Sequence, residues 1–335
     1  MCVRIAIDLN IFEILAQAKG TDVTAAEIAF QANADPKLVV RIMRVLTASG
    51  YGVEKGAELY IGNATSDAMV ETGMVASFRL AFDQTTLVAN AAPGFFRETG
   101  HRNVEDATRT PFKHTYQTTL EYFPWLGTQP AALDDFANWM SSKDKISRGW
   151  LDWFPVEKHV MLGATTNSSD DKVLIVDVGG GKGHDLKRFK DRFTDTRGRL
   201  ILQDLPAMVP QVSPEQAFEI VPHDFFTPQP VKGARVYYLN TVLHDWPDSR
   251  CREILEHLKH AMTKGYSKII INEAILPEQG ASLGHAARDM GMLLMLGAYE
   301  RTERHWRELV ESVGLTVVGV FYDPVPGNGV IVAEI

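Results

Sequence analysis

The sequence predicts an α/β fold: a doubly wound, Rossmann-like domain with a mixed sheet, preceded by an all-α winged-helix domain. Apolar residues at helical spacing dominate the first 100 residues. From residue 173 onward, short β-branched runs alternate with helical segments, which is typical of a doubly wound sheet. The last two strand-like runs, residues 315–321 and 330–334, predict a closing hairpin and therefore a mixed sheet.

The composition excludes several classes of protein. Arg and Lys number 34 against 42 Asp and Glu, so the net charge of −8 disfavours a nucleic-acid or polybasic membrane partner. Two distant cysteines, Cys2 and Cys251, exclude a disulfide framework and a zinc ribbon. No apolar run approaches the ~18 residues of a membrane span, and charges within residues 1–15 exclude a signal peptide. We expect a cytoplasmic protein.

The N-terminal segment shows helix and hairpin signals in order. Apolar residues between 3 and 15 share one helical face. Thr24 and Glu27 form a capping box that starts a second helix, and Asp35-Pro36 starts a third. Residues 51–61 then predict a hairpin, so the segment has the pattern of a winged helix.

A winged helix can bind DNA or serve as a packing and dimerisation module. Up to residue 63 there are six Lys and Arg against seven Asp and Glu, which lacks the positive face that phosphate binding needs. We therefore favour the dimerisation module. The helix that begins at Met1 favours an upstream segment absent from this chain, and we expect a chain without that segment to dimerise less well.

Three domains are expected. Residues 1–100 form the winged-helix domain, and residues 101–165, which are rich in aromatic side chains, form a helical region that caps the substrate. Most of these aromatics belong to an ordinary helical core, while a few are expected to line a pocket for a flat, apolar ligand. The polar run at 167–171 marks the junction to the third domain, residues 166–335.

A glycine-rich turn is the strongest local signal in the third domain. The run VDVGGGKGH, residues 176–184, predicts a strand, a tight turn and a helix, with Gly179, Gly181 and Gly183 allowing a ligand close to the backbone. Its spacing is neither that of a dinucleotide fold nor that of a phosphate loop. Such a turn alone indicates ligand binding only moderately.

Two acidic residues follow the next strand-like segments. Asp204, about 20 residues after the turn, is placed to accept hydrogen bonds from two ribose hydroxyls, although a helix N-cap is the alternative. Asp224 and Phe225, in the run HDFF, suit an adenine amino group and ring face. A turn aspartate is an equally plausible interpretation of Asp224.

A histidine and two glutamates complete the set. His244 follows the strand VYYLN and lies on the ligand edge of the sheet, where an imidazole suits proton abstraction near neutral pH. Glu273 ends the strand IIINE, and Glu300 precedes the last long helix. Carboxylates close to an imidazole fix its tautomer and favour its protonated form. Alone, His244 is more often a structural histidine beside a helix start, and each glutamate is more often a surface residue.

Together, VDVGGGKGH, LQDLP, HDFF, LHDWPD, INEAILP and YERT resemble the class I S-adenosylmethionine-dependent O-methyltransferases, in particular the plant and fungal small-molecule group of the caffeate, flavonoid and sterigmatocystin type. The resemblance covers nearly the whole chain. It implies His244 as general base between Glu273 and Glu300, no catalytic metal, and a homodimer built on the winged-helix domain. The residues implied for S-adenosyl-L-methionine are Asp177, Gly179, Gly181, Gly183, Asp204, Leu205, Asp224, Phe225 and Asn240.

The chemistry favours an acidic hydroxyl on a secondary metabolite. Attack by a phenolate on a sulfonium annihilates charge, which a dry pocket of low dielectric constant favours. A phenol, enol or hydroxypyridone is acidic enough for a histidine base, and an aliphatic alcohol is not. The residues expected to contact such a substrate are His114, Met140, Trp153, Arg288, Asp289 and Met292.

Three positions depart from the family pattern. Where this chain has Asn240, relatives usually carry Lys or Arg. They usually carry Asp at the position of Thr119 and an apolar residue at the position of Arg288. A rebuilt pocket is the sharper interpretation, because some fungal members of this group retain the cofactor and act as pericyclases. The intact base cluster favours methyl transfer over that alternative. A winged-helix regulator that senses a small ligand is a third possibility, which the acidic composition disfavours.

Overall fold

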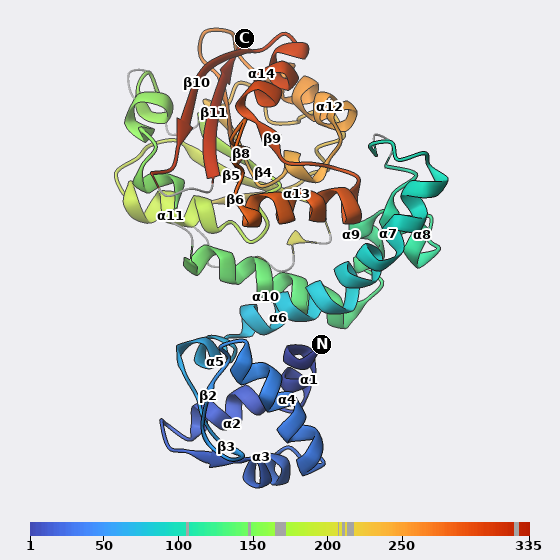
Figure 1. The fold of residues 1–335 in the computed structure, drawn as a ribbon. Coiled ribbons are helices and arrows are strands. Elements are labelled where there is room, and N and C mark those ends of the chain that lie inside the picture. The colour runs from blue at the N-terminus through green and yellow to red at the C-terminus, as the bar shows by residue number, and fades with distance from the viewer. Residues whose placement is uncertain are drawn as a thin grey trace. The chain divides into compact units, whose positions relative to one another are not determined.

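The computed structural model describes residues 1–104, 107–146, 149–164, 172–206, 208–209, 212, 218–324 and 328–335, without the side chains of residues 141 and 143–146 (Figure 1). The chain divides into two compact units, Met1–Gly94 with Tyr122–Ser147, and Phe95–Glu121 with Arg148–Ile335. The junction expected at 167–171 lies outside the described residues. The three domain ranges therefore remain predictions.

The first unit consists of helices and one small sheet. Its elements are α1 (Cys2–Asp8), α2 (Ile11–Gln17), β1 (Val23–Thr24), α3 (Ala25–Gln31), α4 (Pro36–Ala48), β2 (Val53–Gly56), β3 (Leu59–Ile61), α5 (Ala64–Ala68), α6 (Thr72–Leu80), η1 (Ala81–Thr85), α9 (Tyr122–Leu126) and α10 (Pro130–Ile146). Helix α7 (Thr86–Glu98) crosses the division between the units.

The predicted helix starts are confirmed by their caps. The Thr24 hydroxyl accepts from the Glu27 amide at 3.2 Å, and the Glu27 carboxylate accepts from the Thr24 amide at 2.8 Å. Asp35 accepts from the amide of Lys37 at 2.8 Å, ahead of Pro36 in the first turn of α4. These side-chain contacts satisfy amides that a helix start otherwise leaves without partners.

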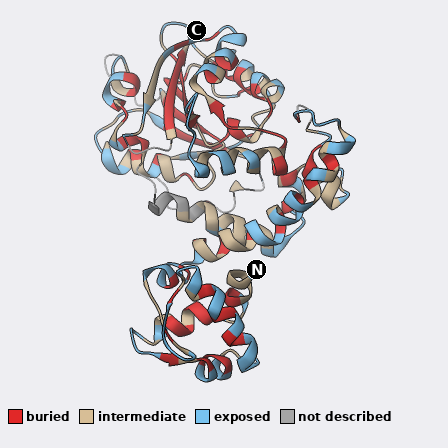
Figure 2. Ribbon diagram, viewed as in Figure 1, coloured by how far each residue is buried: buried red, intermediate tan, exposed pale blue. Residues whose placement is uncertain are grey.

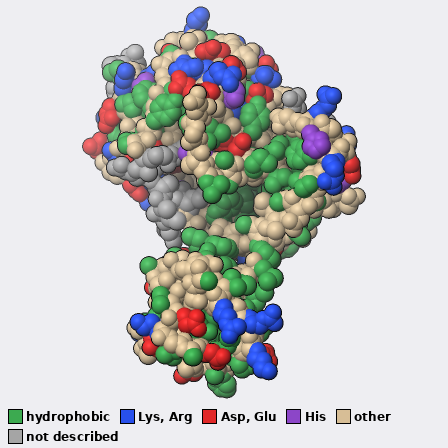
Figure 3. All heavy atoms as spheres, viewed as in Figure 1, with side chains coloured by type: hydrophobic (Ala, Val, Ile, Leu, Met, Phe, Trp, Pro, Cys, Tyr) green, Lys and Arg blue, Asp and Glu red, His purple; other side chains and the backbone are tan. Residues whose placement is uncertain are grey.

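The winged-helix pattern differs from the prediction in two details. The face expected over residues 3–15 is divided into α1 and α2, because Asn10 adopts a left-handed conformation with φ 51°. The predicted hairpin is present as β2 and β3, and β1 adds a third strand in the order β1-β3-β2. On the face of residues 1–71 drawn in Figure 3, acidic and basic side chains are interspersed.

The second unit carries the large sheet and the helices that cover it. Its elements are α8 (Pro111–Tyr116), η2 (Trp150–Asp152), η3 (Glu157–Met161), β4 (Val173–Val178), α11 (His184–Arg192), β5 (Arg199–Asp204), β6 (Glu219–Pro222), β7 (Val236–Asn240), η5 (Leu243–Asp245), α12 (Asp248–Lys259), β8 (Lys268–Leu276), α13 (Leu283–Leu296), β9 (Arg301–Thr302), α14 (Glu303–Ser312), β10 (Thr316–Tyr322) and β11 (Asn328–Glu334).

The strand order is β10-β11-β8-β7-β4-β5-β6, with β9 pairing beside β8. The pairs from β8 to β6 are parallel, whereas β10–β11 and β11–β8 are antiparallel, which confirms the mixed sheet and the closing hairpin. The chain leaves β4 toward β5 on one side and reaches β7 on the other. In open α/β sheets, ligands bind at the carboxyl ends of the strands beside such a switch point.

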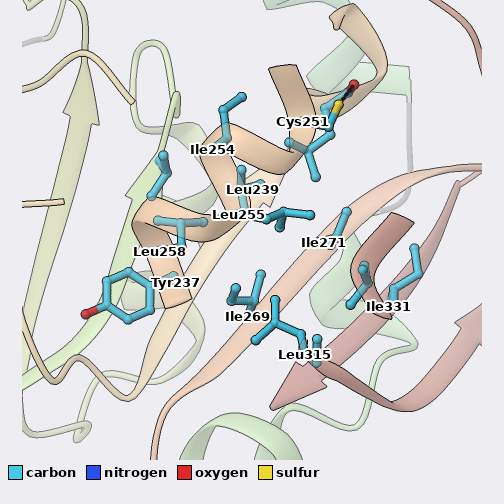
Figure 4. Packing of buried hydrophobic residues seen from close by; sticks show 14 of the residues in the cluster. Tyr237, Leu239, Cys251, Ile254, Leu255, Leu258, Ile269, Ile271, Leu315 and Ile331 are labelled. Atoms are coloured by element: carbon cyan, nitrogen blue, oxygen red, sulfur yellow. Dashed lines mark hydrogen bonds between the residues drawn. The ribbon is translucent and has the colours of Figure 1, made fainter. Parts of the chain in front are cut away.

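The central strands β4, β5, β7, β8 and β11 are largely buried, whereas the edge strands β6 and β10 are partly exposed (Figure 2). Side chains alternate along β7, so Tyr237 and Leu239 join one hydrophobic cluster while Tyr238 joins the other. Figure 4 shows the first cluster, in which side chains of β7, β8 and β11 pack against α12. The second cluster includes Trp150, which stacks on Tyr238 with ring centroids 4.7 Å apart. Covered on both faces, the sheet exposes its strand ends to ligands.

Among the described residues, no helix is long and apolar enough to cross a membrane. Within the same part of the chain, no group of three or more His, Cys, Asp or Glu side chains is arranged to hold a metal ion.

Candidate active site

Glycines at four positions shape the turn between β4 and α11, for conformational reasons at some and for lack of space at others. Gly179, Gly181 and Gly183 have φ of 74°, 58° and 77°, the left-handed region that glycine adopts without a steric penalty. At Gly180, a Cβ atom would overlap the carboxyl group of Asp177 and the Leu202 side chain. The glycines therefore leave a half-buried stretch of backbone with few side chains at the end of the central strand.

Asp204 is attached to this turn. Its Oδ2 accepts from the Gly181 amide at 2.8 Å, and its Oδ1 accepts from the Leu205 amide at 2.7 Å. Burial raises the pKa of Asp204, and the two amide donors oppose that rise. The structure thus brings the predicted ribose-binding carboxyl beside the glycine turn, although 23 residues of sequence separate Asp204 from Gly181.

The segment after β6 supplies an aromatic wall. The ring of Phe225 would lie 3.5 Å from a Cβ atom built on Gly179, and it meets Trp246 edge-on at 6.1 Å. Asp224 is exposed, and its Oδ1 accepts from the Phe226 amide at 3.0 Å, as a turn aspartate does. Phe225 therefore lines the turn, and the adenine contact of Asp224 stays a prediction.

A polar network lies at the same strand ends. Asn240 Nδ2 donates to Asp185 Oδ2 at 2.7 Å, and the Tyr238 hydroxyl donates to the same oxygen at 3.2 Å. Among the described residues, neither carboxyl oxygen of the buried Asp177 has a hydrogen-bond partner. Burial, together with the negative charges of Asp185 and Asp204, raises the pKa of Asp177 well above its usual value. Sequence reasoning missed Asp185 and Tyr238; the signal available was their place beside the glycine motif and in the strand VYYLN.

The Glu273 side chain holds the short helix η5 by accepting hydrogen bonds from backbone amides at the start of that helix. Glu273 Oε1 accepts from the amides of Val242 at 2.9 Å, Leu243 at 2.8 Å and His244 at 3.3 Å. Burial raises the pKa of Glu273, and the positive charge of His244 opposes that rise. The hydrogen bonds of Glu273 thus reach the backbone of His244 and not its ring, so it positions the histidine segment.

Glu300 contacts the imidazole itself. His244 is buried, with Nδ1 2.9 Å from Glu300 Oε1 and Nε2 3.3 Å from Asp245 Oδ1. Burial lowers the pKa of His244, but the carboxylates of Asp245, Glu273 and Glu300 outweigh burial and raise that pKa to about 9. The Glu300 pairing was predicted. Asp245 was not assigned a role, although it stands in the same LHDWPD motif.

Two neighbouring residues of helix α13 also hold Glu300 in place. Asp289 Oδ1 accepts from the Glu300 amide at 2.8 Å, and Arg288 Nε lies 2.8 Å from Glu300 Oε1. Burial raises the pKa of Glu300, but the hydrogen bond from His244 and the charges of His244 and Arg288 bring it below the usual value. The ionised carboxylate therefore lies between two cationic groups.

Arg301, a buried arginine that sequence reasoning missed, holds the segment that carries His244, residues 243–248. Arg301 donates from Nε and Nη2 to Asp248 Oδ1 at 3.0 and 2.8 Å, and from Nη2 to the Trp246 carbonyl at 2.9 Å. Its Nη1 donates to the Leu243 carbonyl at 3.2 Å. Its position in the motif YERT, next to Glu300, was the only signal in the sequence.

The other residues predicted to contact the substrate lie on several different elements. Met292 lies one turn after Arg288 on α13, so the two share a face. His114 lies on α8, 3.9 Å from Glu98 Oε2, and Trp153 meets Phe154 edge-on at 6.5 Å. Met140 belongs to α10 in the first unit. Of this set, Arg288 and Asp289 are the residues with described contacts to the Glu300 cluster.

Comparison with known families defines the class. Residues 104–316 match the O-methyltransferase domain, and residues 1–71 match the O-methyltransferase dimerisation domain. The chain therefore belongs to the O-methyltransferase family with an N-terminal dimerisation domain.

Fungal relatives support the narrower assignment. The chain is 38% identical to methyltransferase cfoC of Aspergillus candidus over 95% of this chain and 78% of the relative. It is 36% identical to O-methyltransferase asqD of Emericella nidulans, over 98% of this chain and 85% of the relative. It is 33% identical to the demethylsterigmatocystin 6-O-methyltransferase of Aspergillus parasiticus, over 94% and 80%. These matches confirm the predicted resemblance to the fungal small-molecule group.

Solved structures share the fold. A structure described as LepI in complex with SAM superposes with a TM-score of 0.92 at 31% identity, covering 100% of this chain and 85% of that one. A structure described as a pericyclic reaction enzyme gives the same TM-score, identity and coverage. The predicted fold class, a Rossmann-like domain with a helical N-terminal domain, is confirmed.

Proposed function

We propose that the chain is an S-adenosyl-L-methionine-dependent O-methyltransferase that acts on an acidic hydroxyl of a secondary metabolite, with His244 as general base. The observation that carries the proposal is the 2.9 Å contact between His244 Nδ1 and Glu300 Oε1 at the strand ends that also bear the glycine turn. The acceptor is a phenol, an enol or a hydroxypyridone.

The residues around the glycine turn fit the cofactor. The glycines at 179, 180, 181 and 183 allow a ligand close to the backbone, and the Asp204 carboxyl, fixed by two amides, is a natural acceptor for ribose hydroxyls. The negative charges of Asp185 and Asp204 contribute to raising the pKa of Asp177, and the same negative field favours a ligand with positive groups. When bound, the cofactor supplies an electrophilic methyl group on a sulfonium.

His244 takes the proton of the substrate hydroxyl at Nε2. Glu300 Oε1, 2.9 Å from Nδ1, is the nearer of the two carboxylates that contact the ring and holds the N–H at Nδ1. Nε2, which lies 3.3 Å from Asp245 Oδ1, is then the acceptor in the neutral ring. A pKa of about 9 lies within about one unit of a phenol, so the proton transfer is nearly balanced. An aliphatic alcohol is a far weaker acid, and the same base does not deprotonate it.

The direct test is transfer of label. Wild-type chain incubated with methyl-labelled cofactor and a set of phenols, enols and hydroxypyridones should yield labelled ether and one equivalent of demethylated cofactor. Label that stays on the cofactor while a product forms would contradict methyl transfer.

Activity should rise with pH. The base must be neutral, and its pKa is raised to about 9, so kcat/KM for a phenol should increase about tenfold per pH unit below that value. Glu300→Gln removes a charge that raises this pKa, so the profile should move toward lower pH. Glu311→Gln, on the exposed surface, is the matched control and should leave the profile unchanged. An unmoved profile in Glu300→Gln would contradict the assignment.

Cofactor affinity should depend on Asp204. Asp204→Ala removes a charged acceptor for two hydroxyls, and we expect the Kd for S-adenosylhomocysteine to rise about 100-fold, measured by calorimetry. Asp191→Ala, an exposed aspartate on α11, is the control and should leave the Kd unchanged. A rise of less than threefold in Asp204→Ala would place the ribose elsewhere.

A pericyclase is the second candidate. It is favoured by the solved pericyclic reaction enzyme at 31% identity and by Arg288, a fixed positive charge beside Glu300. The label experiment separates the two, because a pericyclase forms product without consuming the cofactor. The retained His244–Glu300 pair favours methyl transfer.

We also propose that the chain forms a homodimer through its dimerisation domain and that its partner otherwise is a small-molecule substrate. The match of residues 1–71 to a dimerisation domain supports the first statement. Light scattering of the purified chain tests it.

A further inference from the structure

Arg288 has a donor that the contacts within the chain leave unused. Its Nε lies 2.8 Å from Glu300 Oε1 as an ion pair, but neither Nε nor Nη2, both of them buried, makes a hydrogen bond within the described part of the chain. The other Glu300 oxygen, Oε2, is also buried without a partner. A guanidinium presents Nε and Nη as a planar pair of donors suited to two acceptor oxygens. Here Glu300 Oε1 is the ion-pair partner at Nε, and no oxygen of the described residues accepts a hydrogen bond from Nη2.

The place of this donor is fixed relative to the base. His244 Nδ1 and Arg288 Nε both lie within 3 Å of the same atom, Glu300 Oε1. Glu300 itself has a fully buried side chain, and its backbone amide donates to Asp289, the residue after Arg288. Met292 on the same face of α13 adds an apolar surface one turn away. The cationic donor is therefore held close to the imidazole by elements of a single unit.

We infer that Arg288 is a specificity-determining residue, which donates a hydrogen bond to a carbonyl oxygen placed two carbons from the hydroxyl-bearing carbon. The inference rests on the proposed function, because it requires His244 to receive the hydroxyl proton. The substrate class is then a hydroxyl conjugated with a nearby carbonyl: an ortho-acyl phenol, an enolised β-dicarbonyl or a 4-hydroxy-2-quinolone.

The chemistry of deprotonation supports this class. When such a hydroxyl loses its proton, the negative charge spreads onto the carbonyl oxygen. A guanidinium at that oxygen stabilises the anion by a charge-assisted hydrogen bond. A simple phenol has no second oxygen to accept the bond. Arg288 thus distinguishes two phenols that present the same hydroxyl to His244.

The test compares matched isomers in the full-length chain. The substrates are pairs of acetylphenols and acetylnaphthols in which the acyl group is ortho or para to the hydroxyl, with methyl-labelled cofactor. The wild type should prefer each ortho isomer in kcat/KM. Arg288→Met should lower kcat/KM for the ortho isomers about 10- to 150-fold, the effect of one hydrogen bond to a charged group, and change the para isomers much less.

The ratio of ortho to para activity distinguishes a direct contact of Arg288 with the substrate from a purely structural role of Arg288. If Arg288 only orients Glu300, the variant loses activity toward both isomers equally, and the ratio of ortho to para kcat/KM stays constant. That result would overturn the inference while the proposed function stands. Arg288→Lys keeps the charge without the planar donor pair and should restore the ratio only in part. Arg304→Met, at an exposed arginine of α14, is the matched control and should leave both activities unchanged. Failure of every isomer to accept label, with normal calorimetric binding of S-adenosylhomocysteine, would contradict the proposed function itself.

Discussion

His244→Ala should lower kcat/KM for methyl transfer to a phenol by about 10²- to 10⁴-fold, the usual contribution of a general base. The imidazole is buried, held at Nδ1 by Glu300 and supported through its backbone by Glu273. The effect should appear in the chemical step, and the Kd for S-adenosylhomocysteine should change less than threefold. Rates from labelled cofactor and calorimetry on the same preparation measure both quantities.

The matched control for this variant is His260→Ala. His260 is exposed on the surface at the end of α12, and its ring contacts only the Glu256 carbonyl among the described contacts. It should retain wild-type turnover. Undiminished turnover in His244→Ala would remove the base role, and raising the pH should recover part of the lost rate because the phenol then ionises in solution.

Arg301→Met should lower the free energy of unfolding by about 3 kcal/mol, the lower end of what breaking a buried ion pair costs. The guanidinium is fully buried and holds Asp248 together with the carbonyls of Leu243 and Trp246. Removing it takes the guanidinium donor from both carbonyls, which keep only the weaker Cys251 Sγ contact, and a partly exposed Asp248 recovers some hydration. Urea denaturation followed by tryptophan fluorescence measures the change.

Arg304→Met provides the comparison for this stability prediction. Arg304 lies three residues further on and is more than half exposed, and its pair with Glu308 is of the surface kind that contributes less than about 1 kcal/mol. A difference between the two variants of less than 1 kcal/mol would mean that the histidine segment does not depend on Arg301. Loss of turnover in Arg301→Met without loss of stability would give Arg301 a direct role in binding instead.

The fold was largely predictable because its signals are long and periodic. The strands of the central sheet are β-branched runs between helices, and the caps at Thr24 and Asp35 are local to the sequence. The strands that were not predicted, β1, β6 and β9, have two to four residues, which is too short for a pattern. The break at Asn10 comes from one backbone conformation that apolar spacing does not encode.

The site was predictable where a motif ends a strand. Asp204 and His244 follow strands whose carboxyl ends meet at one edge of the sheet, so their proximity follows from topology. The sequence does not say which atom a carboxylate faces. Glu273 therefore proved to bind backbone amides, and Arg301 was missed although it is adjacent to Glu300. Such assignments depend on side-chain geometry across β8, α13 and η5.

The central claim is that a bound cofactor at the glycine turn presents its methyl group to a hydroxyl whose proton His244 accepts. A crystal structure of the full chain with S-adenosylhomocysteine and a phenolic substrate tests it most directly. We predict that the ribose hydroxyls meet Asp204 and that the substrate oxygen lies about 2.6–3.2 Å from His244 Nε2. A nucleoside bound away from residues 179–183, or a substrate hydroxyl outside the reach of His244, would contradict the account.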